Sequence, residues 1–241
     1  MRVRQRVATQ LTAGLAAAVL LTGCGGSDES SESAATSSAE SSSSASEETG
    51  AEVAADAADA LEEAGAAHVT GTIGTGAEEQ SIDLYLQGED AIGSITLGGQ
   101  EVQLLTVGGV SYFQGPADFW LSSGVPQEAV DQLVGVWVVV PATEAAAFQQ
   151  LTLTGLAQEL RSPSDGTVED EVTTDELDGE EVLVVTQADG SSLYVAADDP
   201  RYPLQIVNTG DDAGTLTFDG FGELQEITAP ADALDLSELG A

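Results

Sequence analysis

After residue 65 the chain contains short runs rich in β-forming residues that end in glycine, and apolar and polar positions alternate clearly in one of them. In the run 82–87, isoleucine and leucine occupy every second position, and aspartate, tyrosine and glutamine occupy the others. A period of two is typical of a β-strand with one buried face and one exposed face. Before residue 115 the runs of this kind are HVTGTIG, SIDLYLQG, AIGSITLGG, EVQLLTVGG and VSYFQG. They predict a series of antiparallel hairpins.

Other segments have the spacing of helices. Residues 51–64 combine helix formers with early acids, and Gly65 follows as a C-cap, which predicts a first helix. QEAVDQLVG and the segment 143–161 predict further helices, with Pro163 ending the second and VWVVVP extended between them. Four residues of the longer segment fall near one stripe: Ala147, Leu151, Leu156 and Leu160.

Strand patterns resume after Pro163, and the turns between them contain residues that tolerate positive φ, such as Asp178-Gly179 and Asp189-Gly190. The runs are TVEDEVTTDEL, EEVLVVTQ, SSLYVAA, PLQIVN, TLTFDGFG and LQEITAP. The combined pattern predicts an α+β domain with about ten antiparallel strands and helices that pack on the sheet.

The N-terminus reads as a lipoprotein export signal. Three arginines precede LTAGLAAAVLLTG, an apolar core too short to span a membrane, so residues 1–23 are expected to be a signal peptide. Leu21-Thr22-Gly23-Cys24 resembles the lipobox of bacterial lipoproteins, which implies that Cys24 is acylated and anchors the protein outside the cytoplasm. The alternative is a free or buried thiol, which is unusual for a lone cysteine in a secreted chain.

Composition divides the rest of the chain in two. Residues 25–50 contain eleven serines and six acids and little that could form a core, so residues 24–50 are expected to be a lipidated, disordered linker. Residues 51–241 are long enough for one globular domain with a sizeable core.

All 42 acidic residues follow Cys24, where Arg161 and Arg201 are the basic ones, so the formal charge of that part is −40. This charge argues against a nucleic-acid partner. It also repels anionic lipid head groups, which leaves the acyl group to hold the protein at the membrane. Habitat in high salt would be another reason for such a bias.

The residues give little support for catalysis. His68 is the one histidine, and its surroundings, AAHVTGT, lack a nucleophile-elbow sequence, so we expect no enzyme activity. With one histidine and one cysteine, the chain lacks the ligands for a zinc or redox-metal site. The pairs Asp198-Asp199 and Asp211-Asp212 do not have the spacing of a calcium-binding loop. The sequence therefore predicts neither a metal nor a cofactor.

Four ordered signatures suggest a family over about residues 51–237. They are GGVSYFQG…FW, GVWVVVP…FQQL…LAQEL, LDGEEVLVV…SSLYVAADDPRYPLQI and FDGFGE…ITAP. In this order they resemble the actinobacterial lipoproteins of the LppX/LprG group, which have a LolA-like fold. The resemblance implies an antiparallel half-barrel that wraps a few helices and holds acyl chains of lipids or glycolipids between sheet and helices.

Two functions follow as alternatives. One is a carrier that holds a lipid or other apolar molecule in a cavity between a curved sheet and helices. The other is a non-catalytic envelope module with a filled core that binds a partner such as a transporter or wall component. The candidate cavity residues are apolar, and the aromatic ones either line or fill the space: Leu84, Ile95, Leu104, Tyr112, Trp120, Trp137, Phe148, Leu151, Leu156 and Leu160.

Overall fold

A computed structural model of the chain describes residues 48–76, 79–141, 148, 151–163, 166–210 and 213–235. All of them belong to the compact unit Ser42–Ala241. The expected signal peptide, Cys24, the linker up to residue 47, Ala147 and Asp211-Asp212 lie outside the described residues.

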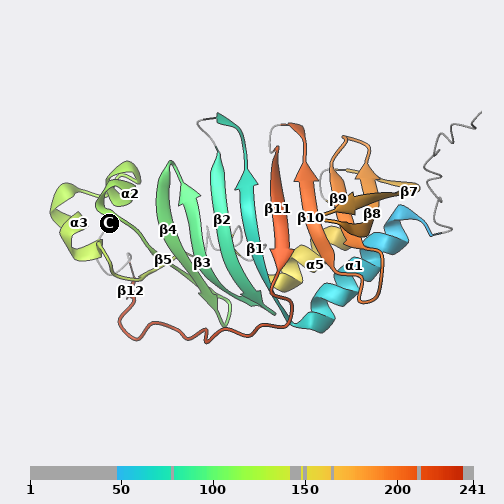
Figure 1. The fold of residues 1–241 in the computed structure, drawn as a ribbon. Helices are drawn as coiled ribbons and strands as arrows, with labels where there is room; N and C mark the ends of the chain where they lie inside the picture. The colour runs from blue at the N-terminus through green and yellow to red at the C-terminus, as the bar shows by residue number, and fades with distance from the viewer. Residues whose placement is uncertain are drawn as a thin grey trace, which may run out of the picture. The chain divides into compact units, whose positions relative to one another are not determined.

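Within this described part, a single open sheet of twelve strands forms the body of the domain (Figure 1). Its order is β12-β6-β5-β4-β3-β2-β1-β11-β10-β9-β8-β7. The strands are β1 Ala66–Ile73, β2 Gln80–Gln87, β3 Asp90–Leu97, β4 Gln100–Val107, β5 Val110–Gln114, β6 Val138–Val139, β7 Val168–Leu177, β8 Glu180–Gln187, β9 Ser192–Ala196, β10 Pro203–Asn208, β11 Gly214–Asp219 and β12 Leu234–Asp235. The α+β class agrees with the prediction from the sequence, and so do the ten strands of five or more residues, which are all of them except β6 and β12.

Two antiparallel meanders build this sheet. Strands β1 to β5 form one and β7 to β11 form the other, and the antiparallel pairing of β1 with β11 unites them. The predicted turn at Asp178-Gly179 joins β7 to β8, and both residues have positive φ, 54° and 90°. Such turns match the twist of the strands that they join.

The described helices are α1 Gly50–Ala64, α2 Ala117–Ser122, α3 Gln127–Leu133 and α5 Leu153–Arg161. Helix α1 packs on strands β7 to β10 and on β1, and α5 packs against α1 (Figure 1). Val53, Ala57 and Leu61 of α1 are fully buried in the main core. Helices α2 and α3 cover a separate small cluster at the β5–β6 end, where Trp120 and Leu133 pack together.

Helix α1 has a complete N-terminal cap. The Glu52 N–H donates to Thr49 Oγ1 (3.3 Å), and the Thr49 N–H donates to the Glu52 carboxylate (2.9 Å), which forms a capping box. Gly65 ends the helix with φ of 72°, as predicted. Arg201 holds Glu48 through two hydrogen bonds of 3.0 Å. The described contacts of the folded unit therefore include Glu48.

The predicted helix over 143–161 differs from the structure. Helix α5 begins only at Leu153, because Thr152 is extended (φ −126°, ψ 160°) and its hydroxyl accepts the Gly155 N–H. A threonine side chain that bonds the following backbone favours a helix start over a helix interior. Of residues 142–150, the structure describes Phe148, which is helical.

The predicted strand LQEITAP is wrong. Residues 224–230 have no strand structure, and Leu224 is 72% exposed. The preceding strand β11 already has β1 on one side and β10 on the other, so this segment finds no free strand edge beside it. The chain forms the short strand β12 later, which pairs parallel with β6.

We predict that Thr49→Ala lowers the free energy of unfolding by about 1 kcal/mol, because it removes the hydroxyl that caps α1. Urea unfolding of the two proteins measures the change. Thr49→Ser keeps the hydroxyl and serves as the matched control, with little expected loss. An unchanged unfolding midpoint in Thr49→Ala would contradict a structural role for this cap.

Candidate functional site

Two adjoining cavities lie between the inner face of the sheet and α5. We call them cavity A, with a volume of about 420 Å³, and cavity B, with about 870 Å³. Leu156 and Glu159 of α5 and Leu216 of β11 line both of them. One helix and the central strand of the sheet therefore form the boundary between the two spaces.

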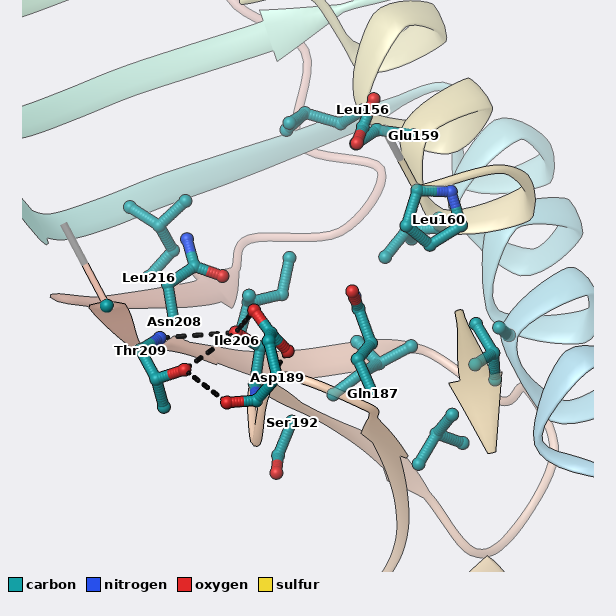
Figure 2. A pocket seen from close by; sticks show the side chains of 17 residues that line it. Leu156, Glu159, Leu160, Gln187, Asp189, Ser192, Ile206, Asn208, Thr209 and Leu216 are labelled. Carbon is teal, nitrogen blue, oxygen red and sulfur yellow. Dashed lines mark hydrogen bonds between the residues drawn. The ribbon is translucent and has the colours of Figure 1, made fainter. Parts of the chain in front are cut away.

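Cavity A lies over strands β8 to β11, next to the first turns of α1. Figure 2 shows Leu156, Glu159 and Leu160 projecting from α5 on one side, with Ile206 and a group of polar residues on the strands opposite. Its apolar wall consists of Ala54, Leu156, Leu160, Pro163, Val168, Val185, Leu193, Ile206 and Leu216. Polar residues and one glycine complete it: Glu159, Gln187, Asp189, Ser191, Ser192, Asn208, Thr209 and Gly210.

Cavity B lies over β1 and β2 and reaches the β4–β5 hairpin. Its apolar wall consists of Val69, Ile73, Ile82, Leu84, Leu86, Leu151, Leu156 and Leu216. Glycines and polar residues complete it: Glu89, Thr106, Gly108, Gly109, Thr152, Thr154, Gly155, Gln158, Glu159 and Ser162. Several of these, including Glu89, Gly109 and Gln158, are exposed, so cavity B opens to solvent along α5 and the hairpin.

Glycines at inward-facing strand positions help to leave this space. Gly71 of β1 pairs with Leu216 and Ile82, both of which line cavity B, and Gly93 of β3 pairs with Leu84, another lining residue. Paired residues of neighbouring strands share a face of the sheet. A Cβ at Gly71 would collide with the carbonyl oxygen of Thr215. The close approach of the strands therefore requires glycine at Gly71, and no side chain fills the face there.

Four of the predicted cavity residues line the spaces. Leu84 and Leu151 line cavity B, Leu160 lines cavity A, and Leu156 lines both. Three other predicted residues belong to the same core but line neither cavity: Ile95, Leu104 and Phe148.

The remaining three predicted residues lie towards the β5–β6 end. Trp120 is buried in the small cluster under α2 and α3, and its indole N–H donates to the Gly115 carbonyl at 3.1 Å. Tyr112 on β5 and Trp137 before β6 are half-buried. None of these aromatic residues lines cavity A or cavity B.

The sequence analysis missed much of the wall of cavity A. Val185, Leu193 and Ile206 come from strands of the second meander. Val185 lies in the uninterrupted apolar run 182–185 and Ile206 lies beside Val207, so the sequence pattern does not show which of these residues face inward. The sequence also did not reveal that α5 lies opposite these strands.

A hydrogen-bonded turn forms part of the polar side of cavity A. The Ser191 N–H and hydroxyl both donate to the Asp189 carboxylate at 2.9 Å, and the Thr209 hydroxyl donates to the Asp189 carbonyl at 2.9 Å (Figure 2). The bonds from Ser191 hold the pKa of Asp189 below its ordinary value. Asp189 therefore carries a negative charge at neutral pH.

The two arginines of the described part pair with α1. Arg161 contacts Asp59 and Glu62, and the hydrogen bonds to Glu62 and Asp59 raise its pKa. Arg201 contacts Glu48 and Asp56. Neither arginine lines cavity A or cavity B.

The lone histidine lies on the outer face of the sheet, because its strand neighbour Val69 faces the core. His68 Nε2 is 2.9 Å from Asp83 Oδ1, Nδ1 is 3.0 Å from Asp219 Oδ1, and the ring stacks on Tyr85 with centroids 4.1 Å apart. Burial lowers the pKa of His68, but the hydrogen bonds to Asp83 and Asp219 outweigh it and raise the pKa above its ordinary value. A protonated ring that donates to both carboxylates links β2 to β11 across β1.

The described residues hold neither a metal-ligand cluster nor a membrane-spanning helix. No group of three or more histidine, cysteine, aspartate or glutamate residues there is placed to hold a metal ion. No helix in that part is long and apolar enough to cross a membrane.

Comparison with known proteins supports the fold. A crystal structure of LprF from Mycobacterium bovis is similar with a TM-score of 0.51 and 15% sequence identity, over 76% of this chain and 97% of LprF. A crystal structure of the lipoprotein LppX from Mycobacterium tuberculosis has a TM-score of 0.48 and 14% identity, over 74% of this chain and 98% of LppX. No protein-family model and no curated protein matches the sequence. The similarity to LprF confirms the fold that the sequence signatures suggested.

We predict that the stabilising effect of His68 depends on pH. The pKa of His68 is higher in the folded than in the unfolded state. Its contribution to the free energy of unfolding is therefore fully present below the unfolded pKa, about 6.5, and is lost as the pH rises through the folded pKa. The Tm of the wild type should therefore exceed that of His68→Gln by the largest amount at pH 6, and this difference should shrink towards pH 9.

Thermal melts across this range test the prediction. A double variant, Asp83→Asn with Asp219→Asn, keeps the histidine but removes both carboxylates, and it should lose the same pH-dependent part. A difference between wild type and His68→Gln that stays constant from pH 6 to pH 9 would show that the paired histidine does not titrate in this way.

Proposed function

We propose that the protein is a cell-envelope lipoprotein that binds a lipid or another apolar molecule in cavities A and B. The observation that carries the proposal is the pair of adjoining cavities, about 420 and 870 Å³, with leucine, isoleucine and valine walls and polar residues at their exposed sides. Ligand sites are typically clefts of roughly 300–1,000 Å³ with this mixture of lining residues.

The alternative, an envelope module with a filled core, is less well supported. Such a module would pack its helices against the whole inner face, as the cluster around Trp120 does at the β5–β6 end. Over β1, β2 and β8 to β11, cavities A and B and the glycine positions leave space beside α5 instead. The low identity to LprF limits that comparison to the fold, so the cavities bear the argument for a ligand.

The location that we propose follows from the N-terminal sequence. An acylated Cys24 would hold the protein at the outer face of the cell membrane, with the serine-rich segment between anchor and domain. Acyl chains of lipids in that membrane are then the nearest apolar molecules for the cavities. No cofactor is required for this function.

We predict that Leu156→Trp reduces binding of a fluorescent acyl probe and costs little stability, because Leu156 lines both cavities and the larger ring can occupy their space. In a filled core the same change would overpack and cost about 1–3 kcal/mol. Probe titration and thermal melting of the same samples separate the two cases.

Leu121→Trp is the matched control. Leu121 lies on α2, is 39% exposed and lines neither cavity, so this variant should bind the probe as the wild type does. A wild-type protein that binds no probe, together with a destabilised Leu156→Trp variant, would contradict the carrier function and favour the filled-core module.

We predict that Cys24→Ala releases the protein from the membrane, because it removes the acylation site that the lipobox resemblance implies. Cell fractionation with a carbonate wash measures the distribution, and Ser27→Ala controls for a substitution close to the anchor. Retention of Cys24→Ala in the washed membrane fraction would show that another element holds the protein there.

A further inference from the structure

One row of paired residues crosses the sheet beneath both cavities. In neighbouring antiparallel strands, residues that pair directly share a face of the sheet. From β2 to β8 the successive partners on the inner face are Ile82, Gly71, Leu216, Ile206, Leu193 and Val185. Ile82 lines cavity B, Leu216 lines both cavities, and the last three residues of the row line cavity A. The row therefore forms a continuous apolar floor that runs from one cavity to the other.

The two cavities meet at Leu216, where two neighbouring positions of the sheet have no side chain. Gly71 pairs with Leu216 from β1, and Gly214 lies two positions before it on the same face of β11. A Cβ at either glycine would collide with the backbone of the adjacent strand. Leu156 projects from α5 on the other side of the junction (Figure 2), and Glu159, the third residue that lines both cavities, is exposed. The inner part of the junction therefore consists of two leucines beside open sheet positions.

The row has the length of an extended alkyl chain. The six strands that it crosses are successive neighbours in the sheet, and at about 4.8 Å between strands they span roughly 24 Å. With carbon–carbon bonds of about 1.5 Å in a zigzag, an extended chain of roughly 18–20 carbons has this length. The part of the row in cavity A, from Leu216 to Val185, spans roughly 14 Å, and the part in cavity B, from Ile82 to Leu216, spans roughly 10 Å. Either cavity alone therefore fits an extended chain of at most about 12 carbons.

We propose that cavities A and B hold one long, unbranched alkyl chain, which lies across the strands along this row and passes between Leu156 and Leu216. This inference rests on the proposed lipid binding and adds the class of chain and its path. Each buried CH2 group tightens binding up to about fourfold, so a chain that reaches both cavities gains over one that fills a single cavity. A branched chain or a ring is disfavoured, because it must pass between the two leucines of the junction.

Three probes with the same fluorescent head group and unbranched chains of different length test the proposal. Eight-carbon, twelve-carbon and eighteen-carbon probes are each titrated into the purified protein, below the concentration at which they form micelles. We expect the eighteen-carbon probe to bind at least about tenfold more tightly than the twelve-carbon probe, with one molecule per protein, because its chain extends into the second cavity. An affinity that stops rising at twelve carbons, or two eighteen-carbon molecules per protein, would show that the cavities do not share one chain.

A pair of variants narrows one cavity at a time. Ile82 lines cavity B and not cavity A, Ile206 lines cavity A and not cavity B, and both side chains are half-buried. Ile82→Trp and Ile206→Trp should each weaken binding of the eighteen-carbon probe at least about tenfold, whereas the eight-carbon probe, which fits in one cavity, should respond to one of them at most. Thr217→Trp is the matched control, because Thr217 is exposed on β11 and lines neither cavity. Thermal melts identify a variant that has lost its fold, and the chain-length series on the wild type does not depend on the variants.

The outcomes distinguish this inference from the function on which it rests. If the eighteen-carbon probe binds but only one of the two tryptophan variants weakens it, the chain lies in a single cavity, and the inference is wrong while lipid binding stands. If none of the probes binds, lipid binding fails and the inference fails with it. Weaker binding in both variants, with one eighteen-carbon molecule per wild-type protein, supports both.

Discussion

The pairing of β1 with β11 is the contact on which the domain depends. It joins two meanders that are far apart in the chain, so that His68 and Asp219 meet across 151 positions. Without it, each meander would have an unpaired edge and only part of an inner face. Leu216 of β11 and Val69 of β1 lie at this junction, and residues there line the proposed site. The site therefore forms only when the two halves of the sheet come together, at a cost in chain entropy.

Incomplete filling of the inner face follows from the size of its residues and from the helices that cover it. Helix α1 buries small side chains such as Ala54, Ala57 and Ala58, which let it lie close to the strands. Glycine occupies inward positions at Gly71 and Gly93. Protein interiors are normally close-packed, so space of this size lowers stability when it is empty. A bound ligand would recover part of that stability, because it binds the folded state alone.

Positive charge is scarce in the part of the chain after Cys24. The part of the chain after Cys24 has two arginines and 42 acidic residues. Arg161 links α5 to α1, and Arg201 links the segment before β10 to α1 and to Glu48. Helix α1, which covers the strands of the second meander, thus receives both guanidinium groups. Neither arginine lines cavity A or cavity B. On the outer face, the ring of His68 lies between Asp83 and Asp219 and joins β2 to β11.

The sequence by itself determined the local elements. Short β-rich runs bounded by glycine or turn residues predicted the ten longer strands, Gly65 predicted the end of α1, and Asp178-Gly179 predicted a hairpin turn, because each depends on a residue and its near neighbours. The sequence analysis missed a local cue, the threonine cap at Thr152 that starts α5 within the predicted helix over 143–161. Tertiary structure decided that residues 224–230 form no strand. It also decided that Leu84 lines a cavity while the equally buried Leu104 does not. The physical reason is that the alternation of a strand shows which side chains face inward, whereas open space depends on what packs opposite them.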